Sequence, residues 1–175
     1  MRRRDRGLVD PLREGAGMED LKSSLCLACG MCCDGNLFAF VAVTSDDAKV
    51  FKQAGVEVSD HSGRLRVPQR CGALDGCRCR VYEKRPFVCR KFDCLLVRAL
   101  SDKELPLEDA LGVVQEAKQQ LSRLEALLPR AHAGEPAGPL RRAAALHQAG
   151  TVVSDEAKAA FDEAEEFLRR HFVPD

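Results

Sequence analysis

Apolar residues recur with helical spacing along the C-terminal part of the chain, and this pattern predicts three helices there. The longest helix should run from about residue 106 to Leu128, where Pro129 ends it. A shorter helix, Leu140–Gln148, should follow a linker rich in Ala, Gly and Pro at 131–139. The last helix should begin after its N-cap, Ser154, and end near Phe172. The apolar stripe of the longest helix is Leu107, Ala110, Leu111, Val114, Leu121, Leu124 and Leu128.

The apolar face of the last predicted helix needs a surface to cover it. That surface could belong to the N-terminal part of the chain, to the helix that ends at Leu128, or to a second subunit. Packing within the chain is the simpler prediction, and the oligomeric state stays open. The residues of this face are Ala157, Ala160, Phe161, Ala164, Phe167 and Leu168.

Between residues 37 and 67 the pattern changes to short segments. Leu37–Val43 mixes aromatic and β-branched residues and predicts a strand. Thr44 and Asp47 form a capping-box pattern that should open a helix through about Ala54. Two further strands, Val56–Val58 and Arg64–Val67, should form a hairpin around the intervening turn.

A proline divides the next segment. Pro86 fixes its own φ and biases Arg85 toward extended geometry, so a helix should begin at Pro86. On that helix Cys89, Phe92 and Leu96 would share one face. Cys94 would lie on a different face from Cys89. We therefore do not expect these two cysteines to bind the same metal ion.

The N-terminus is basic but does not form a targeting segment. Acidic residues such as Asp5 and Asp10 interrupt it, and no apolar run of about 7 to 15 residues follows. No later segment is apolar enough to span a membrane. We therefore predict a cytoplasmic protein that does not contact a membrane.

All nine cysteines lie in two stretches, four in Cys26–Cys33 and five in Cys71–Cys94. Cytoplasmic thiols stay reduced, so the clustering and the odd number favour metal binding over disulfide formation. Thiolates at this spacing, with Gly30 and Gly35 permitting tight turns, can converge as metal ligands. The candidate ligands are Cys26, Cys29, Cys32, Cys33, Cys71, Cys77, Cys79, Cys89 and Cys94.

The spacing within each stretch leaves several ligand arrangements open. Three cysteines at x2 spacing are how bacterial ferredoxins present thiolates to an iron–sulfur cluster, with a distant cysteine as the fourth ligand. Two separated CxxC pairs would instead form a zinc site. Side chains of Cys32 and Cys33 must diverge, so one could serve or bridge to a second metal, or remain a buried or reactive thiol. In an extended chain Cys77 and Cys79 would face the same side.

A basic band surrounds the second stretch, although the formal net charge of the chain is zero. From Arg64 to Arg98 there are ten basic residues and three acidic ones. We favour compensation of thiolate charge over phosphate binding, because stacking on nucleic-acid bases would depend on Phe87 or Phe92 alone. Nucleic acid is therefore a disfavoured partner.

These features together predict an α+β protein: a small cysteine-rich metal-binding domain with short strands and a helical C-terminal extension. With 175 residues, 45% of them apolar, the chain suffices for one medium-sized domain and an appendage. We divide it into a disordered leader at 1–20, the cysteine-cluster domain at 21–100 and the helical extension at 101–175.

The combined pattern resembles a known family. CxxCxxCC, followed by C-x-x-Tyr-x-x-Arg-Pro-x-x-Cys-Arg-x-Phe, is similar to a bacterial cysteine-cluster family whose domain is described as zinc- or iron-chelating. The resemblance covers about residues 23 to 97 and implies metal binding without a defined reaction. Cys77 and Cys94 lie outside the minimal pattern. The matching positions are Cys26, Cys29, Cys32, Cys33, Cys71, Cys79, Tyr82, Arg85, Pro86, Cys89, Arg90 and Phe92.

Three functions compete. The first is a protein that holds iron, as an iron–sulfur cluster, for electron transfer or for redox or metal sensing, with a redox protein as partner. The second is a structural zinc module for protein or nucleic-acid interaction. The third, an enzyme with Cys33 or Cys94 as nucleophile, is disfavoured because no histidine lies close to a cysteine in the sequence.

Three residues beside the cysteines should support the ligands rather than bind metal. These are Tyr82, Arg85 and Arg90, and the two arginines could donate to backbone carbonyls or neutralise thiolates. Substitution of either arginine should weaken metal retention without abolishing it.

Overall fold

The computed structural model describes residues 17–132, 137–151 and 153–174. Most of the predicted leader, residues 1–16, lies outside this part of the chain, and the first helix begins at Met18. Helices and short antiparallel strands are both present, which confirms the predicted α+β class. None of the described helices combines the length and apolar character needed to cross a membrane.

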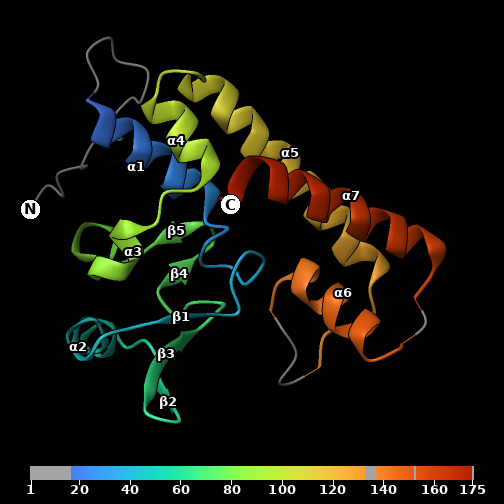
Figure 1. Cartoon of the computed structure of the whole chain (residues 1–175), viewed down its shortest axis with the longest axis horizontal. Helices are drawn as coiled ribbons and strands as arrows, with labels where there is room; N and C mark the ends of the chain where they lie inside the picture. Colours follow the sequence, from blue (N-terminus) through green and yellow to red (C-terminus); the bar gives the residue numbers. More distant parts are fainter. Residues whose placement is uncertain (1–16, 133–136, 152, 175) are drawn as a thin grey trace, which may run out of the picture.

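The molecule has a helical layer and a layer of strands, drawn one above the other in Figure 1. In the helical layer, α1 packs on α4 and α5, and α7 runs along α5. Helix α6 packs against α5 and α7. The bounds are α1 (Met18–Cys29), α4 (Leu95–Ser101), α5 (Leu107–Leu127), α6 (Pro139–Gln148) and α7 (Asp155–Phe172).

The other layer holds two small antiparallel sheets with short helices beside them (Figure 1). The first sheet has the strand order β1-β3-β2, and the second is the hairpin of β4 and β5. The bounds are β1 (Phe40–Ala42), α2 (Ser45–Gln53), β2 (Ser59–His61), β3 (Arg64–Pro68), β4 (Leu74–Asp75), β5 (Arg78–Cys79), the 3-10 helix η1 (Tyr82–Lys84) and α3 (Phe87–Lys91).

Local capping explains where α2 begins. The Thr44 hydroxyl accepts from the Asp47 N–H, and the Asp47 carboxylate accepts from the Thr44 backbone, so the predicted capping box is confirmed. Asp47 also accepts from the Phe87 N–H at 2.9 Å, which ties α2 to the start of α3. The buried Asp47 thereby connects the sheet layer to a cysteine-bearing helix.

Two strand predictions were placed incorrectly. The strand expected at Val56–Val58 lies instead at Ser59–His61, because Val56 is buried against Phe51 rather than paired in the sheet. The strand expected at 37–43 shortens to β1. Burial of an apolar side chain in the small core therefore overrides its preference for a strand.

The single helix expected beyond Pro86 is two helices. Helix α3 ends at Lys91, Phe92 is extended, and Cys94 is the N-cap of α4. The predicted shared face of Cys89, Phe92 and Leu96 is therefore wrong. The break leaves Cys94 at the start of α4, where it packs in a different buried cluster from Cys89.

The C-terminal helices share their core with the cysteine-bearing helices. Leu168 and Phe172 of α7 pack in one buried cluster with Leu25 of α1 and Leu96 of α4. The end of α7 accordingly lies beside α1 and α4 in Figure 1. Packing of the last helix within the chain is confirmed, and the boundary expected at residue 100 falls inside this core.

A loop after the first cysteine stretch holds α6. The Asn36 side chain, 5% exposed, accepts from the Leu140 N–H at 3.2 Å. A Cβ on Gly138 would lie 2.5 Å from the carbonyl carbon of Gly35, so only glycine permits this close approach. The extension is thus fastened next to Cys33.

We expect Asn36→Ala to lower the free energy of unfolding by about 1–2 kcal/mol, because the Leu140 N–H loses its partner and the buried Asn36 side chain is removed. Urea unfolding at fixed metal content measures this change. Gln53→Ala, at an exposed position at the end of α2, is the control and should change stability little. Equal stability of the two variants would contradict the proposed attachment.

Candidate metal centre

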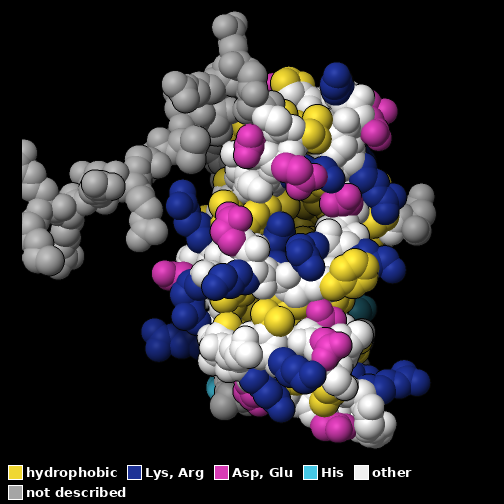
Figure 2. Space-filling view, turned by 90° about the vertical axis from the view of Figure 1, so that its left-hand side faces the viewer, with side chains coloured by type: hydrophobic (Ala, Val, Ile, Leu, Met, Phe, Trp, Pro, Cys, Tyr) yellow, Lys and Arg dark blue, Asp and Glu magenta, His cyan; other side chains and the backbone are white. Residues whose placement is uncertain are grey.

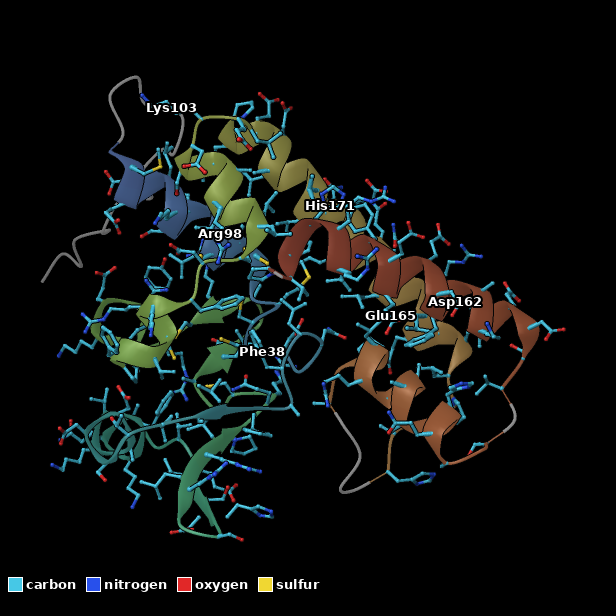
Figure 3. All side chains as sticks on the ribbon, in the orientation of Figure 1. Phe38, Arg98, Lys103, Asp162, Glu165 and His171 are labelled. Carbon is cyan, nitrogen blue, oxygen red and sulfur yellow. The ribbon has the colours of Figure 1, made fainter. Side chains whose placement is uncertain are left out.

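All nine cysteines line one cavity of about 300 Å³ between the helical layer and the sheets. Most of its remaining wall is apolar, and Phe38, labelled in Figure 3, packs edge-on against Phe92 with ring centroids 5.0 Å apart. On the face shown in Figure 2, a hollow with hydrophobic side chains is bordered by both basic and acidic side chains. Every cysteine is a free thiol.

The first set of thiols comes from the helical layer. Cys26 and Cys29 lie on α1, Cys32 follows its C-terminus, and Cys94 precedes α4. Gly30 ends α1 in the left-handed conformation and so turns the chain toward Cys32. We call Cys26, Cys29, Cys32 and Cys94 the helical group.

The second set comes from the sheet layer. Cys71 donates its backbone N–H to the Cys33 carbonyl at 2.8 Å, which joins the two cysteine stretches directly. Cys79 lies on β5, paired with Leu74 of β4, and Cys89 lies on α3. We call Cys33, Cys71, Cys79 and Cys89 the hairpin group.

Cys77 occupies the turn of the β4–β5 hairpin and lines the same cavity. A Cβ on Gly30 would lie 2.8 Å from the Cys77 carbonyl oxygen, so this turn packs against the end of α1. Glycine at position 30 is therefore required both for its positive φ and for this contact.

Tyr82 and Arg85 lie between the two groups. The Arg85 guanidinium is stacked 3.5 Å from the Tyr82 ring centroid, and its Nε donates to the Tyr82 carbonyl at 3.0 Å. Burial raises the pKa of Cys26, and a hydrogen bond with the Tyr82 side chain and the positive charge of Arg85 partly oppose this increase. Arg85 also lowers the pKa of Cys89, while Arg90 is exposed on α3.

Burial strongly favours the neutral thiols. It raises the pKa of Cys29 to about 12 and that of Cys89 to about 11. Neighbouring thiols contribute to both increases, and Lys118 partly opposes the increase at Cys29. Burial also raises the pKa of Cys26, Cys32, Cys33, Cys71 and Cys94.

Two residues that interact with this site were not predicted. Lys118 of α5 donates to the Ala28 carbonyl and lowers the pKa of Cys29, and its position four residues after Val114 places it on the apolar stripe. A lysine on that stripe is a sequence signal for a buried interaction. Lys22 of α1 lowers the pKa of Cys26.

Part of the basic band acts on the thiols. Burial raises the pKa of Cys71 and Cys26, and Arg80 and Arg85 respectively oppose part of that increase. Other members of the band, such as Lys84 and Arg90, are exposed. Raised pKa values at buried thiols also disfavour a cysteine nucleophile, which must ionise. No histidine among the described residues lines the cavity.

The donor set fits the metals that thiolates prefer. Thiolates bind zinc as tetrahedral sets of four and hold iron–sulfur clusters in the same number. Among the described residues, no three His, Cys, Asp or Glu side chains are already arranged around one point as ligands of a metal ion. The chemistry of the residues therefore fits, and the side chains must turn toward a bound group.

Comparison with known proteins identifies one family. The family model for CxxCxxCC, described as a "putative zinc- or iron-chelating domain", matches residues 25–116, just over half of the 175 residues. The match includes both cysteine stretches and continues into α5. No curated protein and no solved structure matches the chain. The family supports metal binding and leaves zinc and iron unresolved.

The raised thiol pKa values predict that the metal-free protein loses stability in alkali. Thiols in the unfolded chain ionise near pH 8.5, whereas Cys89 and Cys29 remain protonated up to about 11 and about 12 when folded. The folded state then binds more protons, so the free energy of unfolding should fall as pH rises above about 8.5.

Urea unfolding of the metal-free protein at about pH 7.5 and about pH 10 measures this trend. The metal-loaded protein should show the opposite dependence, losing stability as acid protonates its thiolates. An unchanged stability of the metal-free protein over that range would show that the thiols are not buried.

Arg85→Ala should lower metal affinity about 10-fold, because Arg85 stabilises thiolates in both groups. Competition with a chelator measures the loss. Arg90 is exposed on α3, so the sequence-based expectation for this residue is replaced: Arg90→Ala should have little effect and serves as the control. Arg85→Lys should recover part of the affinity by restoring the charge, and wild-type affinity in Arg85→Ala would contradict the assigned role.

Proposed function

The chain belongs to the CxxCxxCC family of zinc- or iron-chelating domains, and on this premise we propose that it holds iron as an iron–sulfur cluster through cysteine thiolates. Its role is electron transfer or the sensing of redox state or metal. The cavity of about 300 Å³, lined by all nine cysteines, is the observation that carries the proposal. A bound cluster supplies one-electron chemistry.

The size of the cavity supports a cluster over a lone ion. Four thiolates that bind zinc at about 2.3 Å lie only about 3.8 Å from one another and enclose little space. An iron–sulfur cluster brings inorganic sulfide as well as iron and needs room between its ligands. The three cysteines Cys26, Cys29 and Cys32 have the spacing that such clusters use.

The walls of the cavity support a redox role. Phe38, Phe92 and Val88 line it beside the cysteines and exclude water from the thiolates. Exclusion of water and the neighbouring charges of Arg85 and Lys118 are the means by which a protein sets the potential of a cluster. The chain's own residues thus hold, shield and electrostatically tune the bound group.

A redox protein partner and a cytoplasmic location belong to the same proposal. An electron-transfer centre needs a donor or acceptor, and Phe87, 63% exposed, lies two residues from Cys89 on α3. Exposed aromatic residues are common anchors in protein interfaces. Nine free thiols persist best in the reducing cytoplasm.

A structural zinc module is the second candidate, and the shortness of the cysteine-bearing elements favours it. Strands β4 and β5 have two residues each and α3 has five, too few to be stable alone. One structural zinc can contribute about 10–16 kcal/mol to folding. Such a site would hold these elements together and leave function to the protein surface.

Anaerobic purification followed by analysis of iron, zinc and acid-labile sulfide separates the candidates. We expect iron with equimolar sulfide and a broad visible absorption band, because cluster iron is bridged by sulfide. Stoichiometric zinc in a colourless protein would exclude the iron–sulfur cluster and its redox partner. A protein that retains neither metal would contradict both candidates.

A further inference from the structure

We infer that the chain holds two separate metal centres, one in the helical group and one in the hairpin group. The inference rests on the proposed metal binding and assigns four cysteines to each centre. The first centre uses Cys26, Cys29, Cys32 and Cys94, and the second uses Cys33, Cys71, Cys79 and Cys89.

Side-chain packing divides the cysteines in this way. Cys94, Cys26 and Cys29 pack in the buried cluster that also contains Leu25 and Phe172. Cys71, Cys33, Cys79 and Cys89 pack in a different cluster, which is built on Phe51, Val56 and Val67. The two groups therefore belong to the cores of the two layers.

The backbone explains why neighbouring residues join different groups. Side chains of Cys32 and Cys33 diverge because consecutive residues point to different sides of a chain. Cys33 is held on the sheet side by its carbonyl, which accepts from the Cys71 N–H at 2.8 Å. Cys94 is directed to the helical side by the break between α3 and α4.

Electrostatic interactions between the thiols follow the same division. Within each group every thiol interacts with every other one. Between the groups the strongest interactions include a single pair, Cys32 with Cys33. The groups are hence adjacent, and each one brings four thiols near one another, which must turn inward to bind a metal.

Each centre has cations of its own. Four thiolates around a divalent metal leave a charge of about −2, which nearby cations stabilise. Lys22 and Lys118 act on the helical group, and Arg80 acts on the hairpin group. Arg85 acts on one thiol in each group.

Cys77 remains outside both groups. It lies in the hairpin turn and lines the cavity, but like Cys32 it packs in neither buried cluster. Unlike Cys32, which interacts with Cys26, Cys29 and Cys94, it is not among the strongest electrostatic partners of any other described thiol. Eight of the nine cysteines thus fill two sets of four, which accounts for the surplus over a single tetrahedral site. Cys77→Ser is accordingly a matched control for substitutions within the groups.

Cadmium loading of the wild-type protein tests the inference without depending on mutation. Cadmium prefers thiolate ligands, so one cadmium ion should bind to each set of four thiolates. We expect two tightly bound ions per chain and two ¹¹³Cd resonances without cadmium–cadmium coupling. One ion, or several ions coupled through shared thiolates, would overturn separate centres while leaving metal binding intact.

Substitutions then assign the ligands. Cys94→Ser and Cys79→Ser should each remove about half of the bound cadmium and a different one of the two resonances, whereas Cys77→Ser should remove neither. The double variant should lose both. Loss of all metal in either single variant, with its circular dichroism spectrum unchanged, would indicate one shared centre.

The two proposals fail in different ways. A wild-type protein that binds no cadmium under reducing conditions would overturn metal binding itself, and the two-centre inference with it. A protein that binds one ion keeps the proposed metal binding and rejects the second centre. If a cysteine variant misfolds, the number of ¹¹³Cd resonances of the wild-type protein still tests the two-centre inference.

Discussion

This structure depends on the electrostatic free energy of ionising thiols that lie close together in an apolar cavity. Burial, together with a smaller contribution from the neighbouring thiols, raises the pKa of Cys29 to about 12, so the metal-free site favours neutral sulfur. A bound cation reverses that preference, because thiolates are its ligands. Metal binding, proton release and folding are consequently linked, and the cations Arg85 and Lys118 reduce the cost only in part.

The helical extension is part of the support for this cavity. Phe172, 1% exposed, lies in the same buried cluster as Leu25, next to Cys26 in the sequence. On the other side of the molecule, Asn36 and Gly138 fasten α6 to the loop that follows Cys33. The extension therefore braces both layers where the cysteines meet, and its removal would expose the core of the helical group.

The boundary between the two inferred centres falls at the peptide bond between Cys32 and Cys33. Cys32 and Cys33 are neighbours in the chain, yet one joins the helical group and the other the hairpin group. Two iron–sulfur clusters so connected would lie close enough to exchange electrons, and Arg85 would influence both. The same arrangement with zinc would instead join α1 to α4 at one centre and the β4–β5 hairpin to α3 at the other.

The sequence alone was enough to predict the elements with strong local signals and the family to which the two cysteine stretches belong. The capping box of Thr44 and Asp47, the stripe of α5 and the divergence of Cys32 and Cys33 all depend on neighbouring residues. Tertiary structure decided where Val56 is buried, where the helix after Pro86 breaks, and which of nine thiols face one another. These depend on contacts between distant segments, such as Cys33 with Cys71, whose geometry no spacing along the chain specifies.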